Sequence, residues 1–246
     1  MKIHKLVEGP EHCWYVLARD NERTQSVIDT NEYLILGQDE AILCDPGGTE
    51  IFPQVVSAVA RVTSLDKIKH FLCSHQDPDI FSSLPLWMGL CPQATIHLPW
   101  VWKTFVAHYG HEYVDRFHCL PDEGERLMLG HREFLFVPAH YLHSSGNFHL
   151  YDPQLKVYFS GDVGAALLPD GEQPLFVEDF DAHVQYMDGF HRRWMPSERA
   201  RDAWLARVRK LDIDYFCPQH GSIFKGADVK RFLDWFASLP LGSAIL

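Results

Sequence analysis

The sequence has little that would point to a nucleic-acid partner, a membrane or an exported chain. Among 246 residues, 22 Lys and Arg stand against 33 Asp and Glu, and the formal net charge is −11. An acidic chain without a basic cluster is poorly suited to binding phosphate backbones. No stretch approaches the roughly 18 apolar residues that a membrane helix needs, and no apolar signal segment follows Met1. We therefore expect a cytoplasmic protein that binds neither nucleic acid nor membrane.

Paired cysteine motifs are also absent. The six cysteines form no C-x-x-C pair, and most lie in apolar, strand-like segments: Cys13, Cys44, Cys73, Cys91, Cys119 and Cys217. This pattern favours buried, reduced thiols over disulfides or a thiolate metal site. Histidine, in contrast, is abundant at 15 residues. A site built from imidazoles and carboxylates is therefore the metal chemistry to look for.

The apolar pattern predicts strands and helices in two successive blocks. The first block has strands over 14–18, 33–36, 41–44, 68–73 and 94–98 and helices over 52–62, 82–90 and 100–108. The second has strands over 126–129, 133–137, 148–151, 157–160 and 215–217 and helices over 186–195, 199–210 and 228–239. Two such blocks predict an α/β protein, an αββα sandwich of two mixed sheets between helix layers. No linker or repeat interrupts the pattern, so we expect one domain over 1–246.

Candidate ligands stand at the ends of four predicted strands, where functional side chains often collect. The four segments are His75-Gln76-Asp77-Pro78-Asp79, His143-Ser144-Ser145-Gly146, Ser160-Gly161-Asp162 and Pro218-Gln219-His220-Gly221. Any one alone is weak, because Asp beside Gly is common in turns. The four in this order are far more specific. The remaining histidines, His97 and His118 among them, belong to no motif, and we expect surface or packing roles for them.

In these four segments the sequence resembles the metallo-β-lactamase superfamily, and within it the flavodiiron proteins and stand-alone oxygen-binding diiron proteins. Their ligands come from an H-x-[EH]-x-D-H loop followed by a His, an Asp and a last His. The early Asp45-Pro46-Gly47 also matches the superfamily's Asp-x-Gly turn.

The resemblance implies a two-metal site. One metal would be held by His75, Asp77, His143 and Asp162, and the other by Asp79, Asp162 and His220, with Asp162 bridging. We choose His143 over His140, to which we assign a supporting or packing role. Zinc hydrolases of this fold usually carry His at the position of Asp77. The carboxylate there favours two iron ions, with zinc or manganese as alternatives.

Two positions depart from the family pattern. Asp77 is one carbon shorter than the usual Glu, and Ile80 stands where the last loop His is expected. The second metal therefore lacks an imidazole. Another group could substitute, the metal could bind weakly, or a coordination position could stay open; we favour the open position, which O₂ binding requires.

We therefore expect a diiron protein that binds or reduces O₂, or NO. The chain has no room for the flavodoxin domain of flavodiiron reductases, so we expect a separate electron donor, or a sensor that reports to a signalling protein. A homodimer is compatible with the family. The alternative is a dinuclear metal-dependent hydrolase of a thioester, lactone or phosphodiester, in which metal-bound water is the nucleophile. A scaffold with a vestigial site is the least favoured interpretation, and no catalytic side chain can be named.

Overall fold

The apolar strands of the first block form a seven-stranded sheet in a computed structural model that describes residues 1–18, 27–169 and 174–243. Its strands, in spatial order, are β1 (Lys2–Glu8), β2 (Cys13–Ala18), β3 (Glu32–Leu36), β4 (Ala41–Cys44), β5 (Ile68–Leu72), β6 (Thr95–Pro99) and β7 (Phe117–Leu120). Neighbours from β1 to β4 pair antiparallel, and those from β4 to β7 pair parallel. The carboxyl ends of β4 to β7 therefore share one edge of this sheet.

The second block forms a six-stranded sheet. Its spatial order is β13 (Phe224–Lys225), β12 (Tyr215–Cys217), β11 (Val157–Phe159), β10 (Phe148–Asp152), β9 (Arg132–Pro138) and β8 (Arg126–Leu129). β11 and β12 pair parallel, and the other neighbours pair antiparallel. This parallel pair repeats the arrangement of β4 and β5 in the first sheet.

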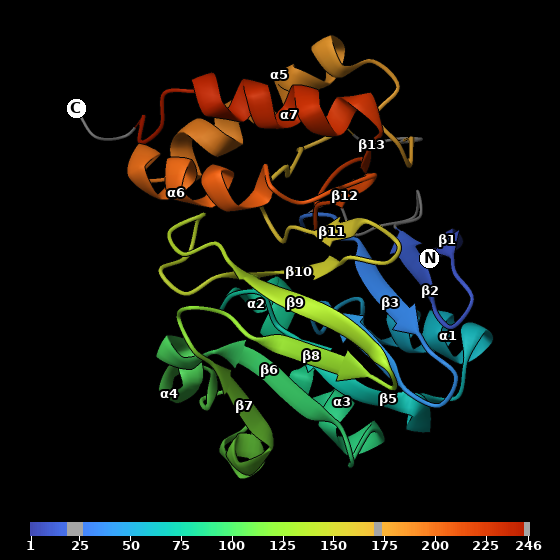
Figure 1. The fold of residues 1–246 in the computed structure, drawn as a ribbon. Helices are drawn as coiled ribbons and strands as arrows, with labels where there is room; N and C mark the ends of the chain where they lie inside the picture. Colours follow the sequence, from blue (N-terminus) through green and yellow to red (C-terminus); the bar gives the residue numbers. More distant parts are fainter. Residues whose placement is uncertain (19–26, 170–173, 244–246) are drawn as a thin grey trace.

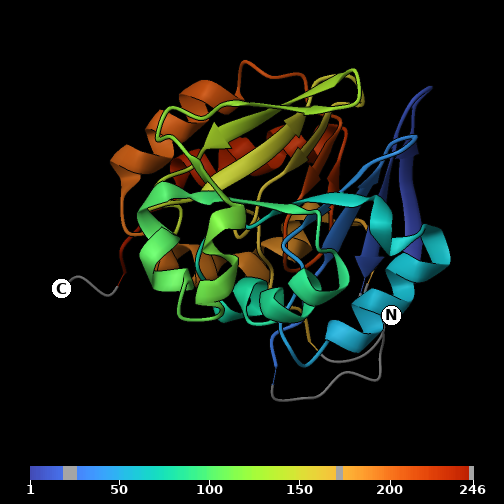
Figure 2. The same ribbon diagram turned by 90° about the horizontal axis from the view of Figure 1, so that it is seen from below.

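Helices cover the outer face of each sheet. They are α1 (Phe52–Val62), α2 (Pro78–Phe81), α3 (Leu84–Leu90), α4 (Lys103–Val106), α5 (Phe180–Trp194), α6 (Glu198–Val208) and α7 (Ala227–Ser238). In Figure 1, α5, α6 and α7 lie together beyond the second sheet, and Figure 2 shows α1 and the short helices on the side of the first sheet. No helix among the described residues is both long and apolar enough to cross a membrane.

Three hydrophobic clusters hold these layers together. One lies between the two sheets and includes Trp14, Phe134 and Phe159. A second joins the first sheet to α1 and α3, and a third joins the second sheet to α5, α6 and α7. Each sheet is therefore apolar on both faces, which confirms the predicted αββα sandwich.

The local differences from the predicted elements have physical causes. Three unpredicted strands, β1, β7 and β13, are all edge strands, and solvent on their open side weakens the apolar pattern. The helix expected over 82–90 is α3, which begins at Leu84 with Pro85 in its first turn, and the short helix α2 before it, which begins at Pro78, was not predicted. The helix expected over 100–108 is a 3₁₀ turn, Trp100–Trp102, followed by α4. Helix α5 begins six residues before the predicted 186, because Asp179 caps its first turn.

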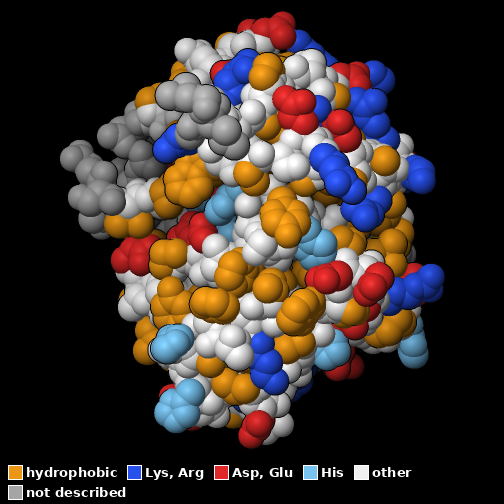
Figure 3. Space-filling model, turned by 90° about the vertical axis from the view of Figure 1, so that its left-hand side faces the viewer, with side chains coloured by type: hydrophobic (Ala, Val, Ile, Leu, Met, Phe, Trp, Pro, Cys, Tyr) orange, Lys and Arg blue, Asp and Glu red, His pale blue; other side chains and the backbone are white. Residues whose placement is uncertain are grey.

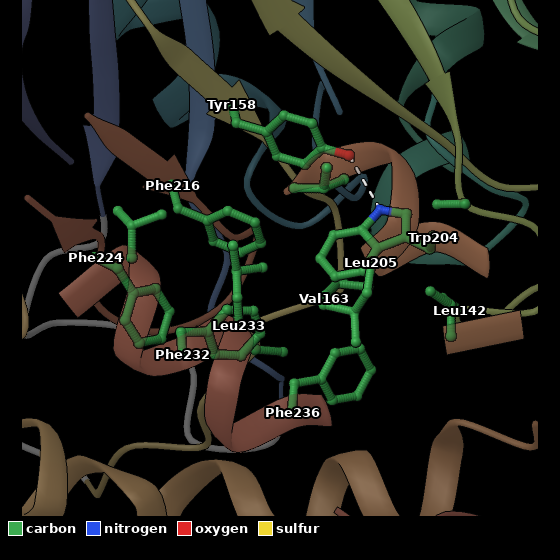
Figure 4. Packing of buried hydrophobic residues seen from close by; sticks show 14 of the residues in the cluster. Leu142, Tyr158, Val163, Trp204, Leu205, Phe216, Phe224, Phe232, Leu233 and Phe236 are labelled. Atoms are coloured by element: carbon green, nitrogen blue, oxygen red, sulfur yellow. Dashed lines mark hydrogen bonds between the residues drawn. The ribbon is translucent and has the colours of Figure 1, made fainter. Parts of the chain in front are cut away.

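The third cluster fixes the position of β12, the strand that leads to the candidate ligand His220. Phe216 of β12 is fully buried and packs against Phe232, with ring centroids 4.9 Å apart. Nearby, the indole of Trp204 donates a hydrogen bond to the hydroxyl of Tyr158 (3.0 Å). Figure 4 shows these rings filling the space between β11, β12 and the helices.

Truncating this ring should destabilise the fold. We expect Phe216→Ala to lower the free energy of unfolding by about 3–5 kcal/mol, because it removes a fully buried ring and leaves a cavity. The control is Phe105→Ala, whose side chain is 62% exposed and whose loss should change stability by less than about 0.5 kcal/mol. Urea denaturation of both variants measures the difference, and equal destabilisation would contradict this description of the core.

Candidate metal centre

Strand ends from both sheets converge on one site. His75 follows β5, Asp162 follows β11 and His220 follows β12. The two sheets are connected there, since the amide of Phe148 on β10 donates to the carbonyl of Ser74 at 3.0 Å. The parallel pairing of β11 and β12 places the loops with Asp162 and His220 side by side.

Three further candidate ligands reach the same site from loops. Asp77 is the residue before α2, and Asp79 lies in the first turn of that helix. Pro78 occupies the first helical position, where its missing N–H has no helical partner to lose. His143 lies in the loop between β9 and β10. All six residues predicted from the sequence are therefore brought together.

Four of them form a first group of donors. One ligand atom from each of His75, Asp77, His143 and Asp162 lies within 4.8 Å of the others. Oδ2 of Asp162 is 2.8 Å from Nε2 of His143 and 3.6 Å from Nε2 of His75. Oδ2 of Asp77 is 3.4 Å from His143 Nε2 and 3.5 Å from His75 Nε2. The donor atoms thus enclose a space of the size that one cation needs.

The other carboxylate oxygen of Asp162 faces a second group. Oδ1 of Asp162 is 3.2 Å from Nε2 of His220, and that nitrogen is 3.4 Å from Oδ2 of Asp79. The two oxygens of one carboxylate therefore point to different sets of donors. This is the geometry in which a carboxylate bridges two metal ions.

Opposite charges dominate the electrostatics of the site. Burial lowers the pKa of His75, but the carboxylates of Asp162 and Asp77 outweigh burial and hold that pKa well above its usual value. Burial also lowers the pKa of His220, while Asp162 and Asp79 raise it to about 9. For Asp162, burial raises the carboxyl pKa, but the facing histidines bring it well below the usual value. Without metal, the imidazoles therefore hold protons as counter-charges.

Two buried atoms at the centre lack a hydrogen bond. Within the described part of the chain, Nε2 of His75 and Oδ1 of Asp162 have no hydrogen-bond partner. Buried polar atoms are costly unless they are satisfied. Cations in the two groups would satisfy both atoms and replace the protons on the imidazoles. The donor set therefore fits a pair of metal ions.

A set of neighbouring side chains orients these donors. Nδ1 of His75 donates to Oγ of Ser74 (2.8 Å), and that hydroxyl donates to Asp45 Oδ2 (2.7 Å). Nδ1 of His220 donates to the carbonyl of Asp29 (2.7 Å). Both histidines therefore carry the Nδ1 proton and present Nε2 to the centre, as metal-ligating histidines usually do.

Two glutamines orient the carboxylates of two candidate ligands. The amide of Gln76 donates to Oδ1 of Asp77 (2.9 Å), and the amide of Gln219 donates to Oδ2 of Asp79 (3.1 Å). Sequence reasoning assigned no role to these glutamines or to Ser74. Their one signal is adjacency, because each precedes a candidate ligand in the chain.

His140 and Ile80 lie outside the two groups. Nε2 of His140 donates to the carbonyl of Asp122 (2.9 Å), and its ring packs against Phe148, with centroids 5.1 Å apart. Ile80 is fully buried and packs in the hydrophobic cluster beneath the first sheet, beside Phe81 and Trp87. It contributes no donor to the second group, which has one imidazole, that of His220.

A cleft of about 410 Å³ leads to both groups. Apolar side chains, among them Ile28, Phe190 and Trp194, form part of its wall. The indole of Trp194 meets the His143 ring edge to face, with centroids 5.3 Å apart, and is stacked on Phe190. In Figure 3, one face of the molecule shows hydrophobic side chains across its centre with histidines among them. The wall is mixed, because Glu50 and the candidate ligands line the cleft beside these apolar side chains.

The protonated site makes the metal-free protein sensitive to pH. His220 has a raised pKa of about 9, and burial raises the pKa of Asp45 to about 7 and that of Glu32 to about 8. Each group binds its proton more tightly when folded. The free energy of unfolding of metal-free protein should therefore fall as pH rises from about 6.5 to about 9.

Bound metal should reverse this trend, because metal replaces the imidazole protons and binds better as they leave. The difference in melting temperature between metal-loaded and metal-free protein should therefore widen across the same interval. Thermal unfolding of both forms at the two ends of the interval measures it. Constant stability of the metal-free form would contradict the protonation described above.

Comparison with known proteins agrees with this geometry. The apo state of the chemotaxis sensor ODP from T. denticola is 36% identical with a TM-score of 0.89, covering 99% of this chain and 97% of that one. A structure of the peroxy diiron species of chemotaxis sensor ODP is 34% identical with a TM-score of 0.89, covering 100% and 98%.

More distant relatives are longer. Rubredoxin-oxygen oxidoreductase from Megalodesulfovibrio gigas is 22% identical over 228 residues, which cover 88% of this chain and 55% of that protein. The chain thus spans about half the length of the curated relatives it matches. A flavo di-iron protein of Thermotoga maritima, at 20% identity and a TM-score of 0.81, shares the fold.

A family model described as "ODP family beta lactamase" matches residues 28–221. The match confirms the resemblance to the flavodiiron branch of the metallo-β-lactamase superfamily that the four strand-end motifs indicated. Because the model covers well over half of the chain, the protein belongs to the ODP family of beta-lactamase proteins.

Proposed function

We propose that this protein holds two iron ions and binds O₂ at them, acting as a sensor. The observation that carries the proposal is the position of Asp162. Its Oδ2 lies among His75, Asp77 and His143, and its Oδ1 lies beside His220. A single buried carboxylate shared between two donor groups is what a two-metal centre requires.

The donor types favour iron over zinc. The two groups contain three carboxylates and three imidazoles, and no thiolate belongs to either. Such hard and intermediate donors suit iron and manganese. The relatives support iron, since the structure of one of them is that of a peroxy diiron species. Zinc remains the metal of the alternative, a dinuclear hydrolase.

His75, Asp77, His143 and Asp162 would hold the first iron. Asp79, Asp162 and His220 would hold the second. When bound, the ferrous pair supplies electrons and a free coordination position for O₂. Since Ile80 is directed into the core, the second group has fewer protein donors than the first, and we place the open position there.

The chain's own side chains prepare this site. Ser74 and the carbonyl of Asp29 keep the Nδ1 protons of the two facing histidines in place. Gln219 holds Asp79 by its amide. Phe190 and Trp194 shield the His143 side of the cleft from water.

We infer a sensor because the relatives that this chain matches over nearly their whole length include a chemotaxis sensor. Rubredoxin-oxygen oxidoreductase, whose name includes a redox partner, is a longer protein, and this chain matches 55% of its length. We propose that a change at the metal centre is reported to a signalling protein, and that any electrons for reduction of O₂ come from a separate donor. A homodimer and a cytoplasmic location are part of the same proposal.

The test is anaerobic loading with ferrous iron, a count of bound metal, and an optical spectrum before and after O₂ is admitted. We expect about two irons per chain and a visible band that depends on O₂. Asp162→Asn should lose both, because it weakens the shared ligand. The matched control is Asp122→Asn, the same change at an aspartate that bonds Trp100 (2.7 Å), which should behave as the unmodified protein.

Two results would overturn the proposal. Retention of two irons by Asp162→Asn would show that this carboxylate does not bridge the metals. Zinc that iron cannot displace, together with no spectral response to O₂, would favour the hydrolase.

The hydrogen bonds behind His75 should also matter. We expect Ser74→Ala to weaken metal binding by roughly 10–100-fold, because His75 loses the partner that fixes its ring orientation. Ser83→Ala is the control, since Ser83 is equally buried but its hydroxyl donates to the backbone carbonyls of Pro46 and Gly47. Metal titration of both variants measures the effect, and equal affinities would refute the orienting role.

A further inference from the structure

A second cluster of potential ligands lies on other strands. His97 lies on β6, His118 on β7 and Glu125 just before β8. One ligand atom from each lies within 4.8 Å of the others. None of the three belongs to the motifs around the first centre.

The strand register explains why the two histidines meet. His97 and His118 are directly paired between the parallel strands β6 and β7, so their side chains leave the same face of the sheet. Their ring centroids are 5.1 Å apart. That face is turned toward the second sheet, since the ring of His97 also lies 5.4 Å from that of Phe136 on β9.

His97 supplies the observation that points to a ligand. Its side chain is on a residue 5% exposed, and among the residues that the structure covers its Nδ1 has no hydrogen-bond partner. Its other nitrogen, Nε2, lies 3.0 Å from Nδ1 of His70 on β5. Burial lowers the pKa of His97 to about 3. The imidazole is therefore neutral at pH 7, with a lone pair available for a cation.

The other two side chains supply charge and access. Nε2 of His118 and Oε1 of Glu125 are in contact, and their side chains are 46% and 28% exposed. The backbone of Glu125 is held in place, because its carbonyl accepts from the amide of Phe136 (2.8 Å). An ion can therefore reach the cluster from solvent, and Glu125 can neutralise part of its charge.

A plain ion pair between His118 and Glu125 would account for those two residues. It would leave the buried Nδ1 of His97 without a hydrogen-bond partner, which is costly. A cation shared by all three residues removes that cost. Two imidazoles and one carboxylate also match the three protein ligands of many zinc sites, with water in the fourth position.

We propose that His97, His118 and Glu125 bind one divalent transition-metal ion, with zinc as the probe. His97 would ligate through Nδ1 and donate its Nε2 proton to His70, which orients the ring. Since the ligands come from β6, β7 and the start of β8, the ion would clamp the open edge of one sheet to the other.

The test compares zinc binding by the unmodified protein and by His118→Ala in equilibrium dialysis at fixed free zinc. We expect the unmodified protein to bind one more zinc per chain than the variant. Ions at the first centre are common to both, so the difference does not depend on what that centre holds. The fall in zinc affinity at this site in His118→Ala should exceed the roughly 10–100-fold fall that removal of an orienting partner causes.

The control is His111→Ala, which removes an exposed histidine beside Glu112 (3.4 Å) without a buried third ligand. It should bind as much zinc as the unmodified protein. Zinc should also raise the melting temperature more in the unmodified protein than in His118→Ala or Glu125→Gln. Equal zinc content in unmodified protein and His118→Ala, with equal thermal shifts, would overturn the proposal.

Discussion

The carboxylate of Asp162 faces imidazoles on both sides, and the arrangement of the site depends on this contact. Its Oδ2 lies 2.8 Å from His143 and its Oδ1 lies 3.2 Å from His220. A buried carboxylate is expensive unless compensating charge surrounds it. The metal-free protein supplies that charge as protons on histidine, and a metal pair would supply it directly. Folding, protonation and metal binding are therefore linked at this residue.

Tight turns in the loops after β11 and β12 position Asp162. Gly161 and Gly221 both have positive φ, 49° and 88°, which favours glycine. A Cβ on Gly221 would lie 2.6 Å from Cβ of Ala166 and 2.9 Å from its backbone nitrogen. The loops after β11 and β12 thus approach so closely that only glycine fits. The large aromatic core behind these strands keeps the loops in that position.

Much of the architecture was predictable from the sequence because strands buried on both faces produce long apolar runs. The strands that escaped prediction are edge strands such as β1 and β7, whose exposed sides carry no such signal. At the site, His75, Asp162 and His220 were identifiable because each ends a strand beside turn-forming residues. Gln219 and Ser74 were not assigned roles, since their contacts depend on side-chain directions that no local pattern encodes.

The sequence by itself determined the αββα class through its periodicity and the four strand-end segments through their residue types, while the six candidate ligands within those segments followed from the family resemblance. Only the tertiary structure decided that His143 faces Asp162 while His140 turns to Asp122, because both lie in one loop and differ only in direction. It also decided that Ile80 packs into the core and that His97 meets His118 and Glu125. These contacts join residues from separate strands, and their geometry exists only once the sheets are assembled.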